Sequence, residues 1–181
     1  MKVIRNVHYL AELLNEKKQK NKYIVHCHGV FDLLHLGHIK YFQEAKTYGD
    51  VLLVTVTQDE YVRRGPGRPV FNAEQRAEAI SALEVVDYVT INEYPTAVDM
   101  IKLLEPDYYV KGPDYKNYKN DLTGNIKLEE QAVKSVGGEI RFTNDITFSS
   151  TTLINQNISI FSSEQKLFID KLKKKYTVND V

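Results

Sequence analysis

The chain has 181 residues, 43% hydrophobic and 27% charged, which fits one globular domain with a short appendage. Its 24 basic residues balance 24 acidic ones, and no apolar stretch reaches the ~18–20 residues of a membrane span, so neither a nucleic acid nor a membrane is an expected partner. Residues 1–5 lack the long apolar core of a signal peptide. The single cysteine, Cys27, cannot form an internal disulfide and is expected to be buried, so we expect a cytoplasmic protein.

Helical and extended segments alternate along the chain. Helices are predicted from the spacing of apolar residues and from capping residues over residues 7–20, 37–48, 73–83, 96–104 and 126–136. Strands are predicted over residues 23–28, 51–57, 87–91, 108–111 and 139–142. The alternation predicts a Rossmann-like, doubly wound α/β fold, with a five-stranded parallel sheet and helices on both of its faces.

Two polar segments are expected to be loops, and the residue pattern changes near the C-terminus. Residues 63–70 hold two glycines, two prolines and three arginines, and residues 112–124 are polar and tyrosine-rich, so both are expected to be loops. After residue 155 the pattern changes, and residues 163–176 fit an amphipathic helix. We therefore expect a domain over residues 1–155 and a helical extension over residues 156–181, which either packs on a partner subunit or leads to a further domain.

The richest chemical signal is GVFDLLHLGH, residues 29–38, which follows a strand and opens a helix. At such a corner a parallel sheet presents backbone N–H groups and the positive end of a helix dipole. His35 and His38 are three residues apart, so both can face one ligand, and Gly37 lets a phosphate approach the backbone. No cysteine or carboxylate set completes a zinc site with them, so no metal is assigned to protein ligands.

Structural interpretations compete with this one. A lone histidine at a strand–helix junction is usually a satisfied structural residue, and two histidines around a glycine make that interpretation less favourable here. His26 and His28 lie on the preceding strand and should point to one face of the sheet. We expect these two to be packing residues or supports for the site.

The segment HLGH, residues 35–38, matches the HxGH signature of the cytidylyltransferase-like nucleotidyltransferase superfamily. Residues 37–50 resemble glycerol-3-phosphate cytidylyltransferases, whereas GPGRPV, EQR, ALEVVD and VKGPDY resemble heptose-1-phosphate adenylyltransferases (residues 65–70, 74–76, 82–87 and 110–115). SSTT, residues 149–152, matches the superfamily's second signature, a serine/threonine turn that opens a late helix. These blocks follow the family order over residues 23–155.

The resemblance implies a reaction and a set of residues. A phosphate oxygen of a small phosphorylated acceptor attacks the α-phosphorus of a nucleoside triphosphate, and pyrophosphate leaves. Because the acceptor phosphate is already anionic, catalysis should come from positioning and charge stabilisation. Mg²⁺ is the implied cofactor, bridging the phosphates with few protein ligands, and a homodimer is implied. The catalytic residues are then His35, His38, Arg63 and Lys111, and the nucleotide-binding residues are Gly29, Val30, Phe31, Asp32, Gly37, Arg64, Arg76, Gly112, Asp114, Ser149, Ser150, Thr151 and Thr152.

Several of these assignments have alternatives. Arg63 and Arg64 stand where family members carry a lysine, and arginine keeps the charge while adding bidentate contacts. Asp32 either helps at the nucleotide or braces its loop. Arg76 either reaches a phosphate or forms a surface ion pair with Glu78 or a neighbour, and residues 149–152 could be a simple helix cap.

The substrate pair is less determined than the reaction. Glycerol-phosphate cytidylyltransferases carry an arginine shortly before the serine/threonine turn, and residues 142–148 lack one. The loop motifs favour ATP and a phosphorylated sugar, for surface polysaccharide precursor synthesis. The alternatives are a CTP-dependent enzyme acting on glycerol 3-phosphate, another polyol phosphate or a phosphonate, and a non-catalytic nucleotide-binding module. A class I aminoacyl-tRNA synthetase fragment is disfavoured by the zero net charge and the absence of a lysine-rich KMSKS-type loop.

Overall fold

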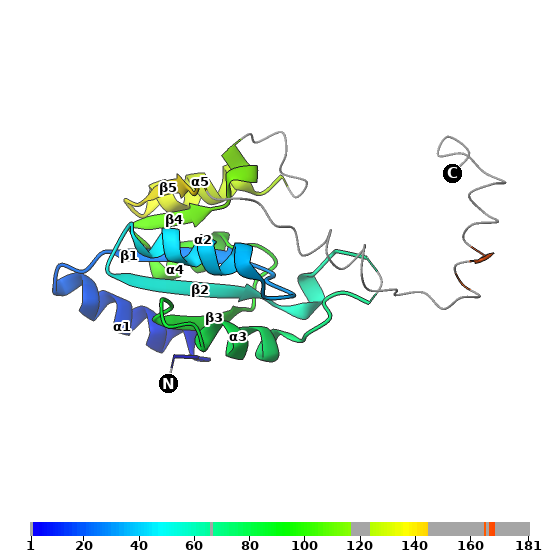
Figure 1. Ribbon diagram of the computed structural model, residues 1–181. Helices are drawn as coiled ribbons and strands as arrows, with labels where there is room; N and C mark the ends of the chain where they lie inside the picture. Colours follow the sequence, from blue (N-terminus) through cyan, green and yellow to red (C-terminus); the bar gives the residue numbers. More distant parts are fainter. Residues whose placement is uncertain (1, 66, 117–123, 145–164, 166, 169–181) are drawn as a thin grey trace.

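The computed structural model describes residues 2–65, 67–116, 124–144, 165, 167 and 168 (Figure 1). The helices are α1 (Val7–Gln19), α2 (Leu36–Lys46), α3 (Ala73–Ser81), α4 (Val98–Leu104) and α5 (Ile126–Ser135), with 3-10 turns η1 (Asp59–Tyr61) and η2 (Pro113–Lys116). The strands are β1 (Ile24–Gly29), β2 (Val51–Thr57), β3 (Tyr88–Asn92), β4 (Tyr108–Lys111) and β5 (Glu139–Phe142). The predicted bounds of these elements are confirmed to within two residues. The predicted C-terminal helix lies largely outside the described residues.

The five strands form one parallel sheet in the order β3-β2-β1-β4-β5. The chain builds outward from β1 to β2 and β3, then returns to the other side of β1 for β4 and β5. The strand order therefore reverses between β1 and β4, and ligands of open α/β sheets bind at the carboxyl ends of the strands beside such a reversal. The predicted Rossmann-like architecture is confirmed.

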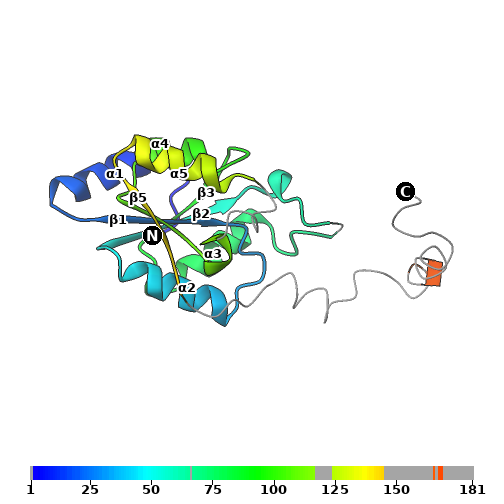
Figure 2. The ribbon, with the colours of Figure 1, turned by 90° about the horizontal axis from the view of Figure 1, so that it is seen from above.

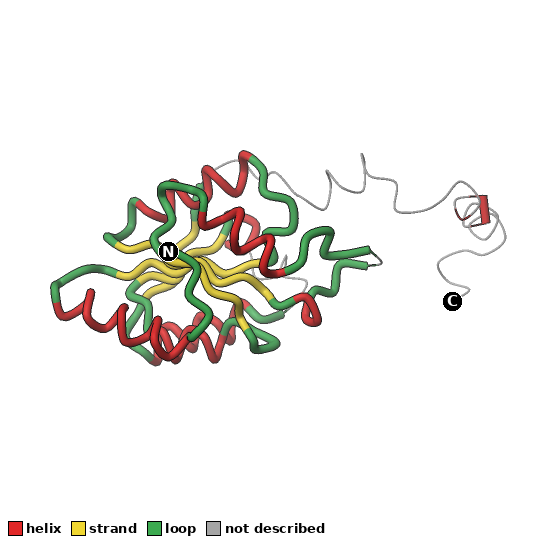
Figure 3. Tube along the Cα trace, turned by 90° about the horizontal axis from the view of Figure 1, so that it is seen from below, coloured by secondary structure: helices red, strands yellow, loops and turns green. Residues whose placement is uncertain are grey.

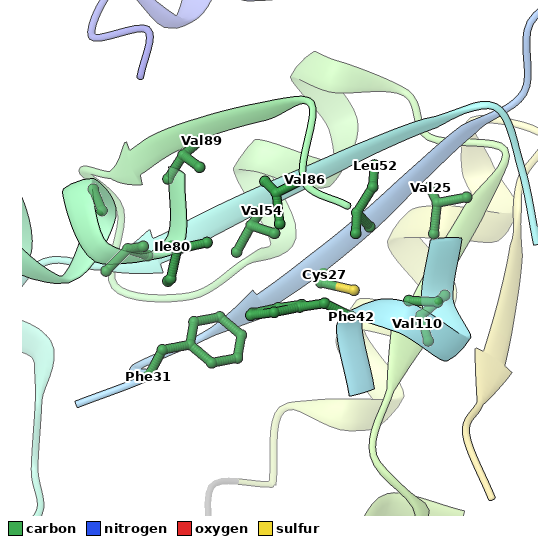
Figure 4. Close-up of a cluster of buried hydrophobic side chains, with 13 residues drawn as sticks. Val25, Cys27, Phe31, Phe42, Leu52, Val54, Ile80, Val86, Val89 and Val110 are labelled. Carbon is green, nitrogen blue, oxygen red and sulfur yellow. The ribbon is translucent and has the colours of Figure 1, made fainter. Parts of the chain in front are cut away.

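Helices cover both faces of the sheet, as Figures 2 and 3 show: α2 and α3 lie on one face, and α1, α4 and α5 on the other. Under α2 and α3 the core is apolar (Figure 4), and Cys27 lies in it with no exposed surface, beside Phe42 and Val110. Burial raises the pKa of the Cys27 thiol to about 12, so this thiol is packing rather than chemistry. Among the described residues, none of the helices combines the length and hydrophobicity of a membrane span.

Candidate active site

The corner between β1 and α2 brings the two predicted histidines together. His35 caps α2 with an extended backbone, and its ring Nδ1 accepts a hydrogen bond of 3.1 Å from the Gly37 amide. One turn later His38 stacks on His35, with 3.9 Å between ring centroids and 21° between ring planes. The prediction that both imidazoles lie at one corner is confirmed.

Both imidazoles are neutral at physiological pH. Burial is the main cause that lowers the pKa of His38 to about 4, and the nearby His35 lowers it further. Burial also lowers the pKa of His35. A neutral imidazole carries one N–H and one lone pair. Since His35 Nδ1 accepts from Gly37, its proton is on Nε2, so the ring offers an N–H donor rather than a positive charge.

Phe31 packs against the corner and supports its shape. Its backbone is left-handed (φ 50°), which is uncommon outside glycine and turns the chain sharply after β1. Its side chain is buried and meets the ring of His38 edge-on at 5.3 Å. A Cβ on Gly29 would lie 2.9 Å from the Phe31 ring, so Gly29 makes room for that ring. For both residues the structure shows a packing function, and their contact with a nucleotide stays a prediction.

Asp32 ties the corner to the loop between β2 and α3. Its Oδ2 accepts a 2.6 Å hydrogen bond from Arg68 Nε, and its Oδ1 accepts from the amides of Val70 and Phe71. The side chains of Asp32 and Arg68 are 2% and 3% exposed. Of the two functions considered for Asp32, the structure shows the brace. Nothing in the sequence around Arg68 points to a partner 36 residues away, so this ion pair is not evident from the sequence.

Arg76 is buried and joins four segments. Its guanidinium donates to the backbone carbonyls of Val30, Thr57 and Phe71 and forms an ion pair with Asp59. The alternative of a surface ion pair is wrong, since Arg76 is only 2% exposed. Four hydrogen bonds occupy most of the five N–H donors of a guanidinium, so Arg76 is a brace here, and its contact with a phosphate stays a prediction.

The loop between β2 and α3 projects past the carboxyl edge of the sheet (Figure 1). Arg63 and Arg64 are exposed on it. Their contact with a nucleotide stays a prediction.

Lys111 ends β4 across the strand-order reversal from β1. It is buried, and its Nζ lies 2.9 Å from Oε2 of Glu129 in α5 and 4.7 Å from the ring centroid of Tyr115. The next residue, Gly112, has open space where a Cβ would stand, whereas Asp114 is exposed on η2. Glu129 was missed from the sequence, because an acidic residue in the middle of an amphipathic helix gives no sign that it is buried.

The Cytidylyltransferase-like family model matches residues 26–157, which is most of the chain. This chain belongs to the cytidylyltransferase-like family. The match spans the β1–α2 corner with its stacked histidines, the loop after β2 and Lys111.

Curated relatives share the same region. The chain is 37% identical over 157 residues to the bifunctional protein HldE of Geotalea uraniireducens and 44% identical over 138 residues to that of Sulfurimonas denitrificans. These matches cover 86% and 75% of this chain but only 31% and 29% of the relatives. The chain thus spans about a third of the length of the curated relatives that it matches.

Two solved structures resemble the fold. A lipopolysaccharide core biosynthesis protein from Thermoplasma volcanium aligns with a TM-score of 0.56 and 29% identity, over 71% of this chain and 99% of that one. A pantoate-β-alanine ligase from Francisella tularensis aligns with a TM-score of 0.61 over 96% of this chain and 78% of that one. Its identity is 15%, so that likeness concerns the fold alone.

The second signature, residues 149–152, lies outside the described residues. Ser149, Ser150, Thr151 and Thr152 therefore remain predictions. Within the described parts of the chain, no group of three or more histidine, cysteine or acidic side chains is placed to hold a metal ion.

Proposed function

We propose that this chain is a nucleotidyltransferase that moves a nucleoside monophosphate, AMP in preference to CMP, from a nucleoside triphosphate to a phosphorylated sugar. The observation that carries the proposal is the stacked pair of neutral imidazoles at the start of α2, beside the reversal of strand order. Phosphates bind where helix N-termini and N–H donors converge. Membership of the cytidylyltransferase-like family supports this chemistry.

In the reaction, an oxygen of the acceptor phosphate forms a bond to the α-phosphorus while the bond from that phosphorus to the bridging oxygen of pyrophosphate breaks. Negative charge accumulates on the equatorial and leaving oxygens. His35 Nε2–H and the start of α2 supply donors to this charge without a net charge of their own. Such preorganised donors stabilise a transition state because they need no rearrangement when charge develops.

Two cationic groups complement the corner. Lys111 is held at the end of β4 by Glu129, and Arg63 or Arg64 approaches from the projecting loop. Asp32 and Arg76 are positioning residues, since they hold the loop that carries these arginines against the corner. The residues that touch substrate and those that position them thus come from different elements.

Mg²⁺ would be carried by the triphosphate rather than by the described residues. Asp32, the carboxylate of the corner, already accepts three hydrogen bonds, one of them from its ion-pair partner Arg68. Mg²⁺ commonly keeps water and phosphate oxygens as its ligands. The ion would supply charge neutralisation on the phosphates.

The acceptor class is argued from the motifs and from the relatives. The loop motifs of residues 65–70 and 110–115 resemble heptose-1-phosphate adenylyltransferases, and the curated relatives are the bifunctional HldE proteins. A solved structure that resembles this chain is that of a lipopolysaccharide core biosynthesis protein. We therefore propose a sugar 1-phosphate acceptor and a cytoplasmic task in surface polysaccharide precursor synthesis. Fusion to a further domain and a homodimer belong to the same proposal.

Release of pyrophosphate tests the proposal. ATP and CTP are each incubated with heptose 1-phosphate, mannose 1-phosphate and glycerol 3-phosphate, and turnover is expected with ATP and a sugar 1-phosphate. His35→Ala and His38→Ala should each lower kcat/KM by ~10²-fold or more, as for lost transition-state donors. His8→Ala is the matched control, since His8 is exposed on α1, at the opposite face of the sheet from α2. Unchanged turnover in both site variants would reject the proposed chemistry.

A further inference from the structure

The two faces of the sheet differ in polarity near the carboxyl ends of the strands. Towards α2 and α3 the side chains there are apolar: Cys27, Val54, Val56, Val89 and Val110. Towards α4 and α5 the alternate positions of four strands are polar instead: His26, His28, Thr55, Thr57, Thr90, Asn92, Tyr109 and Lys111. The amino-terminal half of that same face is apolar, with Ile24, Val51 and Leu53 packed on α1 and α4. Polarity is therefore concentrated on the half of this face that leads to the active-site edge.

Four of these polar side chains form one hydrogen-bonded chain. The hydroxyl of Thr55 lies 2.8 Å from His26 Nε2 and 2.8 Å from His28 Nδ1. The other ring nitrogen of His28, Nε2, lies 3.3 Å from the hydroxyl of Thr57. This hydrogen-bonded series thus runs along β1 and β2 from the fully buried imidazole of His26 to Thr57, the last residue of β2.

This hydrogen-bonded series of four side chains carries no charge. Burial lowers the pKa of His26 to about 3 and that of His28 well below its ordinary value, and the ammonium of Lys111 acts in the same direction. Uncharged imidazoles and hydroxyls both donate and accept hydrogen bonds. They match the hydroxyl groups of a sugar, which also do both, better than they match a phosphate.

The less buried end of this hydrogen-bonded series, His28 and Thr57, lies at the edge of the sheet where catalysis is proposed. His26 and Thr55 have no exposed surface, Thr57 is 8% exposed, and His28 is only partly buried. His28 is the second-last residue of β1, so it lies close to the carboxyl edge of the sheet. The stacked histidines of α2 lie at the same edge, towards the opposite face of the sheet.

We propose that His28 and Thr57 form the subsite that binds hydroxyl groups of the acceptor's sugar, with Thr55 and His26 holding the His28 ring in position. This inference rests on the proposed sugar-phosphate acceptor and adds the residues that select it. The acceptor then lies with its phosphate towards His35 and His38 and its hydroxyls on His28 and Thr57. His28 and Thr57 determine acceptor specificity, whereas the corner of α2 acts on the phosphates of any substrate.

Thr57→Val tests the subsite, because it removes the hydroxyl and keeps the shape of the side chain. The KM for the sugar 1-phosphate should rise about three- to tenfold, the value of one neutral hydrogen bond, while the KM for ATP stays unchanged. Thr90→Val is the matched control. Thr90 lies in register with Thr55 on β3, and its buried hydroxyl has no hydrogen-bond partner among the described residues, so both KM values should stay at the wild-type level.

A binding measurement on the wild-type protein separates this inference from the proposed function. The imidazole nitrogen resonances of His28, assigned with a His28→Gln variant, are followed by NMR while heptose 1-phosphate or a non-hydrolysable ATP analogue is added. The sugar phosphate should shift them and the ATP analogue should not. A shift without any pyrophosphate release would refute the transferase and keep the subsite. Turnover with no shift, and with an unaltered acceptor KM in Thr57→Val, would overturn the subsite.

Discussion

The carboxylate of Asp32 is the point where the loop between β2 and α3 is tied to the active-site corner. Asp32→Ala removes one hydrogen bond from Arg68 Nε and two from backbone amides, and it leaves the Arg68 guanidinium buried without its counter-charge. Removing one partner of a buried ion pair costs about 3–5 kcal/mol. For a chain of this size, 1 kcal/mol shifts the Tm by about 2–4 °C, so the Tm should fall by roughly 6–20 °C.

Thermal unfolding of Asp32→Ala, Arg68→Ala and the double variant measures this effect, with the Arg5–Glu74 pair as a matched reference. That pair has the same chemistry, but its side chains are 71% and 53% exposed, so Arg5→Ala should leave the Tm close to the wild-type value. The double variant should lose less than the sum of the single variants, because neither charge is then left unpaired. If Asp32→Ala lowered the Tm no more than Arg5→Ala, or if the single effects were fully additive, the buried-pair reasoning would be refuted.

Three further predictions concern stability. The folded-state pKa values of His38 (about 4) and His26 (about 3) lie below the ordinary value of 6.5, so the unfolded chain takes up protons first as the pH falls. The free energy of unfolding should therefore be fully retained above about pH 6.5 and should fall by up to ~1.4 kcal/mol per pH unit and histidine as the pH drops towards 4. An equal urea midpoint at pH 7 and pH 5 would contradict this. Arg76→Lys should cost at least about 2 kcal/mol in urea unfolding, because one ammonium cannot reach the acceptors that the guanidinium joins, and a wild-type midpoint would show that they need no partner. In Gly138→Ala the new Cβ would clash with the Pro106 carbonyl oxygen, so the backbone must move and the Tm should fall by the equivalent of about 1–3 kcal/mol. An unchanged Tm would mean that this packing is loose.

The elements and the histidine corner were predictable because their causes are local. The continuous β-branched run of β2 requires cover on both faces, and the asparagine–glutamine capping box that opens α3 is satisfied within four residues. His35 caps α2 and His38 follows three residues later in its first turn, so the local geometry at the start of this helix brings their rings to one side. The alternation of strands and helices then restricts the sheet to a few parallel topologies.

The sequence by itself thus determined the fold class, the bounds of the elements and the corner where the two imidazoles meet. Only the tertiary structure decided which charges are buried and with what they pair: Asp32 with Arg68, Lys111 with Glu129, Arg76 with three carbonyl groups, and His26 with His28 through Thr55. These partners come from separate elements, except for the two histidines, which share a strand and meet through a third residue. Whether such groups touch depends on strand register and on how each helix crosses the sheet, and neither is written in the spacing of residues along one segment.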